Sequence, residues 1–255
     1  MTNKIKVGLT SWEEKNQTGP RDNREEFKRL PFMRLLDGTN VVRCITDAYA
    51  YCFIRYNGPN ARSKFGDRVY TAWPTYNDED GNSLCPAYNN REELTGSKGN
   101  PKKRYFVGVI DRRDQKIKIF DMSLLVYDQI VVNLNEMSET DPDKRRFSPT
   151  EFDINIRYNA DASSPSGYYH VMPRPVAPLS EADLDLIKSE GGLDQIKAVL
   201  ERQSASPKPE SVQRRLENLG WVPGQAVESE EKSELKAATD EDLSFDEPVS
   251  ASAVN

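Results

Sequence analysis

The apolar residues follow two patterns. Short runs with strand spacing predominate up to about residue 178, with one helical segment among them, and helical spacing predominates beyond it. The first two runs cover residues 30–36 and 41–45, and Asp37 and Gly38 stand between them. An Asp-Gly pair between apolar runs is typical of a β-hairpin, because glycine readily adopts the positive φ of a tight turn. We therefore predict a hairpin here, with its second strand continuing through residues 48–56.

Further strands are predicted from apolar runs and turn residues. A short strand covers residues 68–73, and a second hairpin joins residues 104–111 to 115–120 through a turn at 112–114. Residues 151–158 alternate apolar and polar positions, which favours a strand with one packed face, and residues 167–173 pair with it. Residues 75–101 are rich in Asp, Asn, Gly and Pro, and we predict a long loop there.

Helical spacing appears in four segments. Apolar residues in 122–136 predict one helix between the strands. Ser180 followed by Glu181 and Asp183 is typical of a helix N-terminus, so we predict a second helix that begins there. Residues 193–203 and 207–220 predict two more helices, and Gly220 ends the last one.

This order predicts a mainly β (α+β) fold with a five-stranded OB-type barrel, extended loops and C-terminal helices. The predicted parts are an N-terminal arm (1–29), an OB domain that would bind nucleic acid (30–178), a helical extension (179–224) and a disordered acidic tail (225–255).

Charge is distributed unevenly along the chain. The whole chain has a net charge of −6 and a pI of about 5.1, whereas the nine carboxylates and two lysines of residues 225–255 give that segment −7. Residues 1–224 therefore carry about +1. A near-neutral body with an acidic tail suits a protein that binds and releases a polyanion, although the tail alone is also typical of a solvated terminus.

No apolar run reaches the roughly 18 residues of a membrane span, and the N-terminus lacks the pattern of a signal peptide. We therefore expect a cytoplasmic protein, in the host cytoplasm if it is viral, with no membrane partner. Cys44, Cys52 and Cys85 are expected to be reduced. Cys85 has no second cysteine nearby and His170 is the single histidine, so we predict no metal site and no cofactor.

Aromatic and basic residues share the predicted strands. Rings can stack on unpaired bases at roughly 1–3 kcal/mol per base, while Arg and Lys contact phosphates. The alternatives are that the rings belong to the core and that the charges protect a sheet edge. The predicted DNA-binding residues are Tyr49, Tyr51, Phe53, Arg55, Tyr70, Trp73, Lys102, Lys103, Arg104, Tyr105, Arg112, Arg113, Lys116, Lys118, Arg157, Tyr158 and Tyr168.

The chain offers little for catalysis. With one histidine, no Gly-x-Ser-x-Gly motif and no phosphate-binding glycine loop, the remaining candidates are Asp111, Asp121 and Asp153 as metal ligands of a nuclease. Carboxylates are common in turns, and we predict a protein that is not an enzyme.

Several segments together resemble the single-stranded DNA-binding (helix-destabilising) proteins of tailed bacteriophages. They are residues 32–43, Cys85-Pro86, residues 104–112, residues 151–154 and residues 168–173, so the likeness spans roughly 30–190 plus the acidic tail. The resemblance implies an OB-fold groove that holds single strands without sequence preference. It also implies an acidic tail that competes with DNA and docks replication partners. Members with a zinc ribbon have paired cysteines where this chain has Cys85 alone, which indicates a zinc-free branch.

We therefore expect a single-stranded DNA-binding protein of phage replication, recombination and repair. It protects exposed strands and recruits replication proteins (polymerase, helicase or primase), and self-association is compatible with the sequence. The alternatives are an RNA-binding or transcription-linked OB protein and a carboxylate-dependent nuclease. The predicted partner-binding segment of the tail comprises Asp240, Glu241, Asp242, Leu243, Phe245, Asp246 and Glu247.

Overall fold

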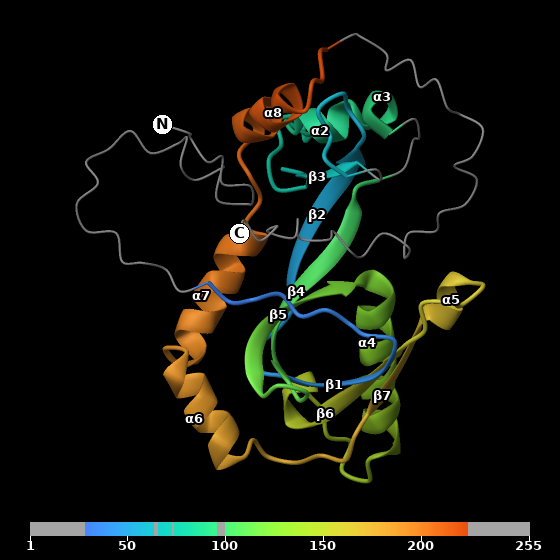
Figure 1. Ribbon diagram of the computed structural model, residues 1–255, viewed down its shortest axis with the longest axis vertical. Helices are drawn as coiled ribbons and strands as arrows, with labels where there is room; N and C mark the ends of the chain where they lie inside the picture. Colours follow the sequence, from blue (N-terminus) through green and yellow to red (C-terminus); the bar gives the residue numbers. More distant parts are fainter. Residues whose placement is uncertain (1–28, 64–65, 73, 96–99, 224–255) are drawn as a thin grey trace, which may run out of the picture.

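The computed structural model describes residues 29–63, 66–72, 74–95 and 100–223 (Figure 1). Within these residues the protein is a mixed α+β structure built on a seven-stranded antiparallel sheet. The strands are β1 (Gly38–Cys44), β2 (Tyr49–Tyr56), β3 (Asp67–Tyr70), β4 (Lys102–Asp111), β5 (Lys116–Ser123), β6 (Asp153–Tyr158) and β7 (Tyr169–Pro173). The predicted α+β class is confirmed.

Strand β4 is the axis of the sheet. Strand β5 pairs along one of its edges, while β2 pairs with the first half of the other edge and β1 with the second half. From β1 the sheet continues through β6 to β7, and from β2 it continues to β3. Among the described residues this path does not close on itself, so the sheet is open and the predicted five-stranded barrel is not seen as a closed barrel.

The lower part of the sheet in Figure 1 contains β1, β5, β6, β7 and the second half of β4, and we call it the lower sheet. One of its faces is covered by α4 (Leu124–Thr140), which begins after the N-cap Ser123. Val126 and Ile130 of this helix pack on Val107, Val109 and other apolar residues of the sheet. The opposite face is covered by α6 (Glu181–Ser189) and α7 (Gly192–Ser204), whose Ile187, Ile196 and Leu200 pack on β4 and β5. Burial on both faces explains why β4 is almost continuously apolar.

The upper ends of β2 and β4 extend into a second lobe, which Figure 1 shows at the top of the molecule. Its helices are α2 (Pro86–Asn89), α3 (Arg91–Thr95) and α8 (Pro209–Asn218). Residues from β2 and β3 pack there on Leu216, Leu219 and Trp221. The segment 75–101, predicted as a loop, therefore contains two short helices.

The predicted hairpin between residues 30–36 and 41–45 is wrong. Both edges of β1 are already occupied, by β4 and by β6, so the preceding segment cannot pair with it. Residues 31–33 instead bind the backbone of Ile119 on β5, at the edge that does not face β4. The side chain of Asn40 bonds the backbone of Leu36 and holds the bend between the two segments.

The hairpin of β4 and β5, the helix α4 and the strands β6 and β7 agree with the predictions within a few residues. The short helices η1 (Pro149–Glu151) and α5 (Pro165–Tyr168) precede β6 and β7. In the part of the chain that the structure describes, every helix is too short or too polar to cross a membrane.

Candidate nucleic-acid interface

Aromatic and basic side chains gather on one face of β2, β3 and β4. Paired residues on neighbouring strands project to the same face. The register pairs Tyr51 with Arg104, and it pairs Phe53 with both Lys102 and Tyr70. We call this surface the aromatic–basic face, and it consists of Tyr49, Tyr51, Phe53, Arg55, Arg68, Tyr70, Lys102, Arg104 and Phe106.

The rings of this face form one cluster centred on Tyr51. Its ring lies 4.2 Å from that of Phe106, 5.3 Å from that of Tyr70 and 6.0 Å from that of Phe53. The guanidinium of Arg68 lies 4.9 Å from the centre of the Phe53 ring. Such distances are those of favourable ring and cation–π contacts.

Burial separates the members of the face into a floor and a rim. Tyr51, Phe53 and Phe106 are buried, with exposed fractions of 5%, 3% and 1%. Tyr49, Arg55, Arg68, Tyr70 and Lys102 are half-buried. The exposed ring of Phe32 lies beside them, 5.9 Å from that of Phe106. The core interpretation of the aromatic residues thus holds for the floor, which belongs to the same core cluster as Ile196 and Leu200 of α7. The half-buried rim residues Tyr49 and Tyr70 pack against this cluster and keep part of their surface exposed.

Asp121 of β5 connects the basic residues of the face. Its carboxylate accepts hydrogen bonds from the Tyr51 hydroxyl, from Arg68 and from Arg104, each at 2.7 Å. Burial raises the pKa of Asp121, but the charges and hydrogen bonds of Arg104 and Arg68 outweigh this and keep it below its usual value. Two guanidinium groups on one carboxylate leave this cluster with a net charge of +1.

Lys103 and Tyr105 lie on the opposite face of β4. The Tyr105 ring stacks on Tyr127 of α4 at 3.9 Å, and the Lys103 ammonium lies 5.3 Å from the Tyr105 ring centre. These two predicted residues are therefore separated from the aromatic–basic face by the sheet itself.

The basic residues at the turn between β4 and β5 are engaged in ion pairs within the protein. Arg112 bonds Asp153 and Asp183, which joins the turn to β6 and α6. Arg113 and Lys118 both bond the buried Asp111, each at 2.8 Å. These contacts hold the turn in place, so we leave Arg112, Arg113 and Lys118 out of the interface. Lys116 is exposed at the start of β5.

The remaining predicted residues lie elsewhere. Arg157 is exposed on β6, beside His170 of β7. The Tyr158 ring lies 5.4 Å from that of Tyr169, and Tyr168 is buried. Trp73 and the tail segment 240–247 fall outside the described residues.

Sequence reasoning missed Arg68, Phe106, Phe32 and Asp121 as parts of this region. Arg68 and Phe106 stand within predicted strands, and strand parity beside Phe53 and Tyr49 could have identified them. Phe32 and Asp121 reach the region only through the pairing of residues 31–33 with β5 and through the bonds that cross β4, which no local pattern indicates.

The three carboxylates considered for metal binding lie in separate clusters. Asp111 is paired with Arg113 and Lys118, Asp121 with two arginines and Asp153 with Arg112. Among the described residues no group of three His, Cys, Asp or Glu side chains has metal-binding geometry. Burial raises the pKa of the Cys44 thiol to about 12, because it disfavours the thiolate.

Comparison of the chain with protein-family models, with curated proteins and with solved structures finds no match.

Proposed function

We propose that this protein binds single-stranded nucleic acid, and DNA in particular, without sequence preference over the aromatic–basic face. The observation that carries the proposal is the cluster of Tyr51, Phe53, Tyr70 and Phe106 interleaved with Arg68 and Arg104 on one sheet face. Unpaired bases stack on rings whatever their sequence, and guanidinium groups contact phosphates. A surface that combines both suits a flexible single strand better than a rigid duplex.

In this proposal the rim makes the contacts and the floor supports them. Bases stack on Tyr49, Tyr70 and Phe32, which are half-buried or exposed. Arg55 and Lys102 contact phosphates at the edges of the face. The buried rings below hold the rim residues in position, which reduces the entropy that binding would otherwise cost.

The strand order supports an OB-type interpretation of the lower sheet. If β1 and β2 are taken as one bent strand, the chain runs strand, β4, β5, α4, β6 and β7, with the helix between the third and fourth strands. The pairing order is then β5, β4, the bent strand, β6 and β7. An OB fold is a partly open five-stranded Greek-key barrel whose second and third strands contribute to the ligand surface. In this comparison those strands are β4 and β5.

We further propose a role in phage DNA replication, recombination and repair, where such a protein protects exposed strands. The acidic segment 225–255 would recruit polymerase, helicase or primase and compete with DNA for the same face. This part of the proposal rests on the sequence, namely the resemblance and the charge of −7 in that segment. No observation in the structure favours the RNA-binding or nuclease alternatives over it.

The test is fluorescence anisotropy with a labelled dT oligomer over a range of salt concentrations. We expect the affinity to fall linearly with salt on logarithmic axes, with a slope that counts phosphate contacts. Tyr70→Ala is expected to weaken binding by about 5- to 100-fold, as the loss of one stacking ring implies. Lys188→Ala removes an exposed charge on α6, where Lys188 pairs with Asp185, and serves as the control for general electrostatic attraction. Equal weakening by both variants would refute the proposed face.

Two further measurements separate the alternatives. A U oligomer that competes better than dT would indicate an RNA-binding protein. Cleavage of the strand in magnesium or manganese that is abolished by Asp111→Ala or Asp153→Ala would indicate a nuclease.

A further inference from the structure

Asn57 and Gly58 lie where the chain leaves β2 and enters the turn that contacts α8. Strand β2 ends at Tyr56, so Asn57 is already outside the hydrogen-bonded ladder, and it is exposed. These two residues are the single Asn-Gly pair of the sequence. The backbone nitrogen that follows an asparagine can attack the carbon of the side-chain amide. Glycine at the following position makes this approach easier, because it has no Cβ to obstruct it.

Both reacting groups of this pair are available. Among the described residues the side-chain amide of Asn57 makes no hydrogen bond, and the N–H of Gly58 donates none. The carbonyl of Gly58 accepts a hydrogen bond of 2.9 Å from the N–H of Ala61, which closes a turn that contains Pro59. The turn therefore holds Gly58 through its carbonyl group and leaves its nitrogen accessible.

Asn82 provides a comparison within the same molecule. It is also followed by a small residue, Ser83, and it is also exposed. Its side-chain amide donates a hydrogen bond of 3.2 Å to Asp78, and its backbone N–H donates one of 2.7 Å to the same carboxylate. Asn82 is thus held in place, whereas Asn57 can turn its amide toward the next nitrogen.

We propose that Asn57 is a site of spontaneous deamidation in the folded protein. Hydroxide removes the proton from the Gly58 nitrogen, and this nitrogen forms a bond to Cγ of Asn57. The bond between Cγ and the amide nitrogen breaks, and that nitrogen takes up a proton and leaves as ammonia. Water then adds to one of the two carbonyl carbons of the resulting succinimide ring. Opening of the ring leaves aspartate or isoaspartate at this position.

Isoaspartate would disturb the contact between the turn and α8. It adds one carbon to the main chain directly before Gly58, where there is little room. A Cβ at Gly58 would lie 2.5 Å from the carbonyl oxygen of Leu219 and 2.4 Å from the ring of Tyr56. The N–H of Asn60, in the same turn, donates a hydrogen bond of 3.2 Å to that carbonyl. We therefore expect the modification to loosen the upper lobe. Asn57 lies outside the aromatic–basic face, so this effect can be tested without nucleic acid.

The test is mass spectrometry of the full-length protein after incubation in native buffer at neutral and at mildly alkaline pH. We expect fragment spectra to show a gain of one mass unit at Asn57, which increases with time and faster at the higher pH. Asn82 in the same samples is expected to keep its mass while half of Asn57 reacts. Equal rates at the two positions would overturn the inference. So would an unchanged Asn57 in the protein when a synthetic peptide of the same sequence reacts.

Variants verify which side chain reacts. Asn57→Gln keeps an amide, but its longer side chain would have to close a six-membered ring, which forms far more slowly. The mass gain is therefore expected to disappear. Asn82→Gln is the matched control and is expected to leave the rate at Asn57 unchanged. Circular dichroism verifies that both variants are folded. A mass gain that persists in the same segment of Asn57→Gln would assign the reaction to Asn60 and refute the proposal.

Two measurements test the product and its effect. An isoaspartate methyltransferase supplied with labelled S-adenosylmethionine should label the incubated protein, and no labelling would refute the succinimide step. Ion exchange separates the isoaspartate form, and Asn57→Asp carries the same charge without the additional carbon. We expect the isoaspartate form to unfold at a lower urea concentration than Asn57→Asp, as measured by the fluorescence of Trp221 in the upper lobe. Equal midpoints would refute the effect on this lobe.

Discussion

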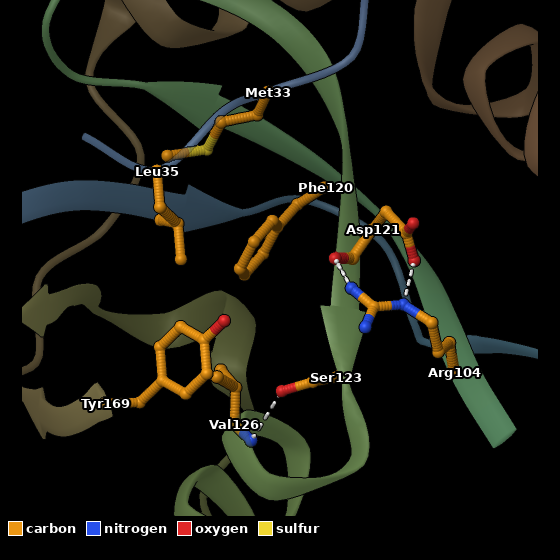
Figure 2. Close-up of a pocket in the computed structure, with 8 residues that line it drawn as sticks. All are labelled: Met33, Leu35, Arg104, Phe120, Asp121, Ser123, Val126 and Tyr169. Carbon is orange, nitrogen blue, oxygen red and sulfur yellow. Dashed lines mark hydrogen bonds and ion pairs between the residues drawn. The ribbon is translucent and has the colours of Figure 1, made fainter. Parts of the chain in front are cut away.

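The hydroxyl of Tyr51 on β2 donates a hydrogen bond of 2.7 Å to the carboxylate of Asp121 on β5, across the intervening strand β4. Arg68 on β3 and Arg104 on β4 bond the same carboxylate. The Asp121 side chain therefore connects β2, β3, β4 and β5, and Figure 2 shows its contact with Arg104. Burial and the nearby Asp121 charge keep the pKa of Tyr51 well above its ordinary value, so the hydroxyl remains a donor at neutral pH.

Removing that hydroxyl tests how much the connection stabilises the sheet. Tyr51→Phe keeps the ring that stacks on Phe106 and removes one of three side-chain donors to Asp121. We expect the free energy of unfolding to fall by about 1–2 kcal/mol, the cost of losing a hydrogen bond to a buried charged group. Urea denaturation measures it. Tyr76→Phe is the control, since the Tyr76 hydroxyl makes no hydrogen bond with the described residues, and an equal loss in both variants would contradict the prediction.

We expect the folded protein to lose stability in acid because of the lowered pKa of Asp111. Burial raises its pKa, but hydrogen bonds from Arg113 and Lys118 outweigh that effect and lower it to about 2. A carboxylate with a lowered pKa in the folded state stabilises the fold above its unfolded pKa of about 3.9, and this contribution disappears as the pH falls from about 4 to 2. The shift corresponds to about 2 kcal/mol. Asp111→Asn is expected to be less stable at pH 7 and to show a flatter pH dependence in this range, as measured by chemical denaturation at each pH. A variant that retains the full acid dependence would assign it to other carboxylates.

Arg112 and Arg55 are both basic and both were predicted to bind DNA, but the structure gives them different surroundings. Arg112 is held by Asp153 and Asp183, whereas Arg55 belongs to the aromatic–basic face. Arg112→Met leaves two carboxylates short of a partner and is expected to cost about 2–3 kcal/mol of stability, with dT affinity within about twofold of the wild type. Arg55→Met is expected to weaken dT binding and, because Arg55 Nη1 donates to the Gly66 carbonyl, to cost only about 1 kcal/mol of stability. Thermal denaturation and anisotropy on the same samples measure both effects, and the reverse pattern would show that the turn contacts DNA.

Gly58 marks the contact between the upper end of β2 and the end of α8. A Cβ atom at this position would lie 2.5 Å from the carbonyl oxygen of Leu219 and 2.4 Å from the ring of Tyr56. Gly58→Ala therefore forces backbone to move, and we expect a loss of about 1–3 kcal/mol. Trp221 lies next to this contact, so its fluorescence during denaturation is the measurement. Gly81→Ala is a control in open space, although its positive φ adds a smaller strain.

Most strands and helices were predicted correctly, because apolar spacing and N-cap residues depend only on neighbouring positions in the sequence. The alternation in residues 153–158, the Ser180 N-cap and the apolar spacing of α4 each depend on neighbours in the sequence. The hairpin at residues 30–36 failed because the occupied edges of β1, which depend on distant strands, decide where that segment pairs.

The candidate site was predicted in part for the same reason. Strand parity brings seven of the predicted residues to one face, namely Tyr49, Tyr51, Phe53, Arg55, Tyr70, Lys102 and Arg104. A charge pattern does not show which carboxylates lie beside a cation in the folded protein. The pairing of Arg112 with Asp183 and of Arg113 with Asp111 could therefore not be predicted from it.

The upper lobe is assembled from two distant parts of the chain. Its core joins Ile54, Val69 and Leu94 to Leu216 and Trp221, more than a hundred residues later. During synthesis the lower sheet and α4 can form while the ribosome is still translating, since domains tend to fold from the N-terminal side. The upper lobe must wait for α8 to emerge. Nascent chains arrested before residue 209 should therefore carry a protease-sensitive upper segment on an otherwise resistant body.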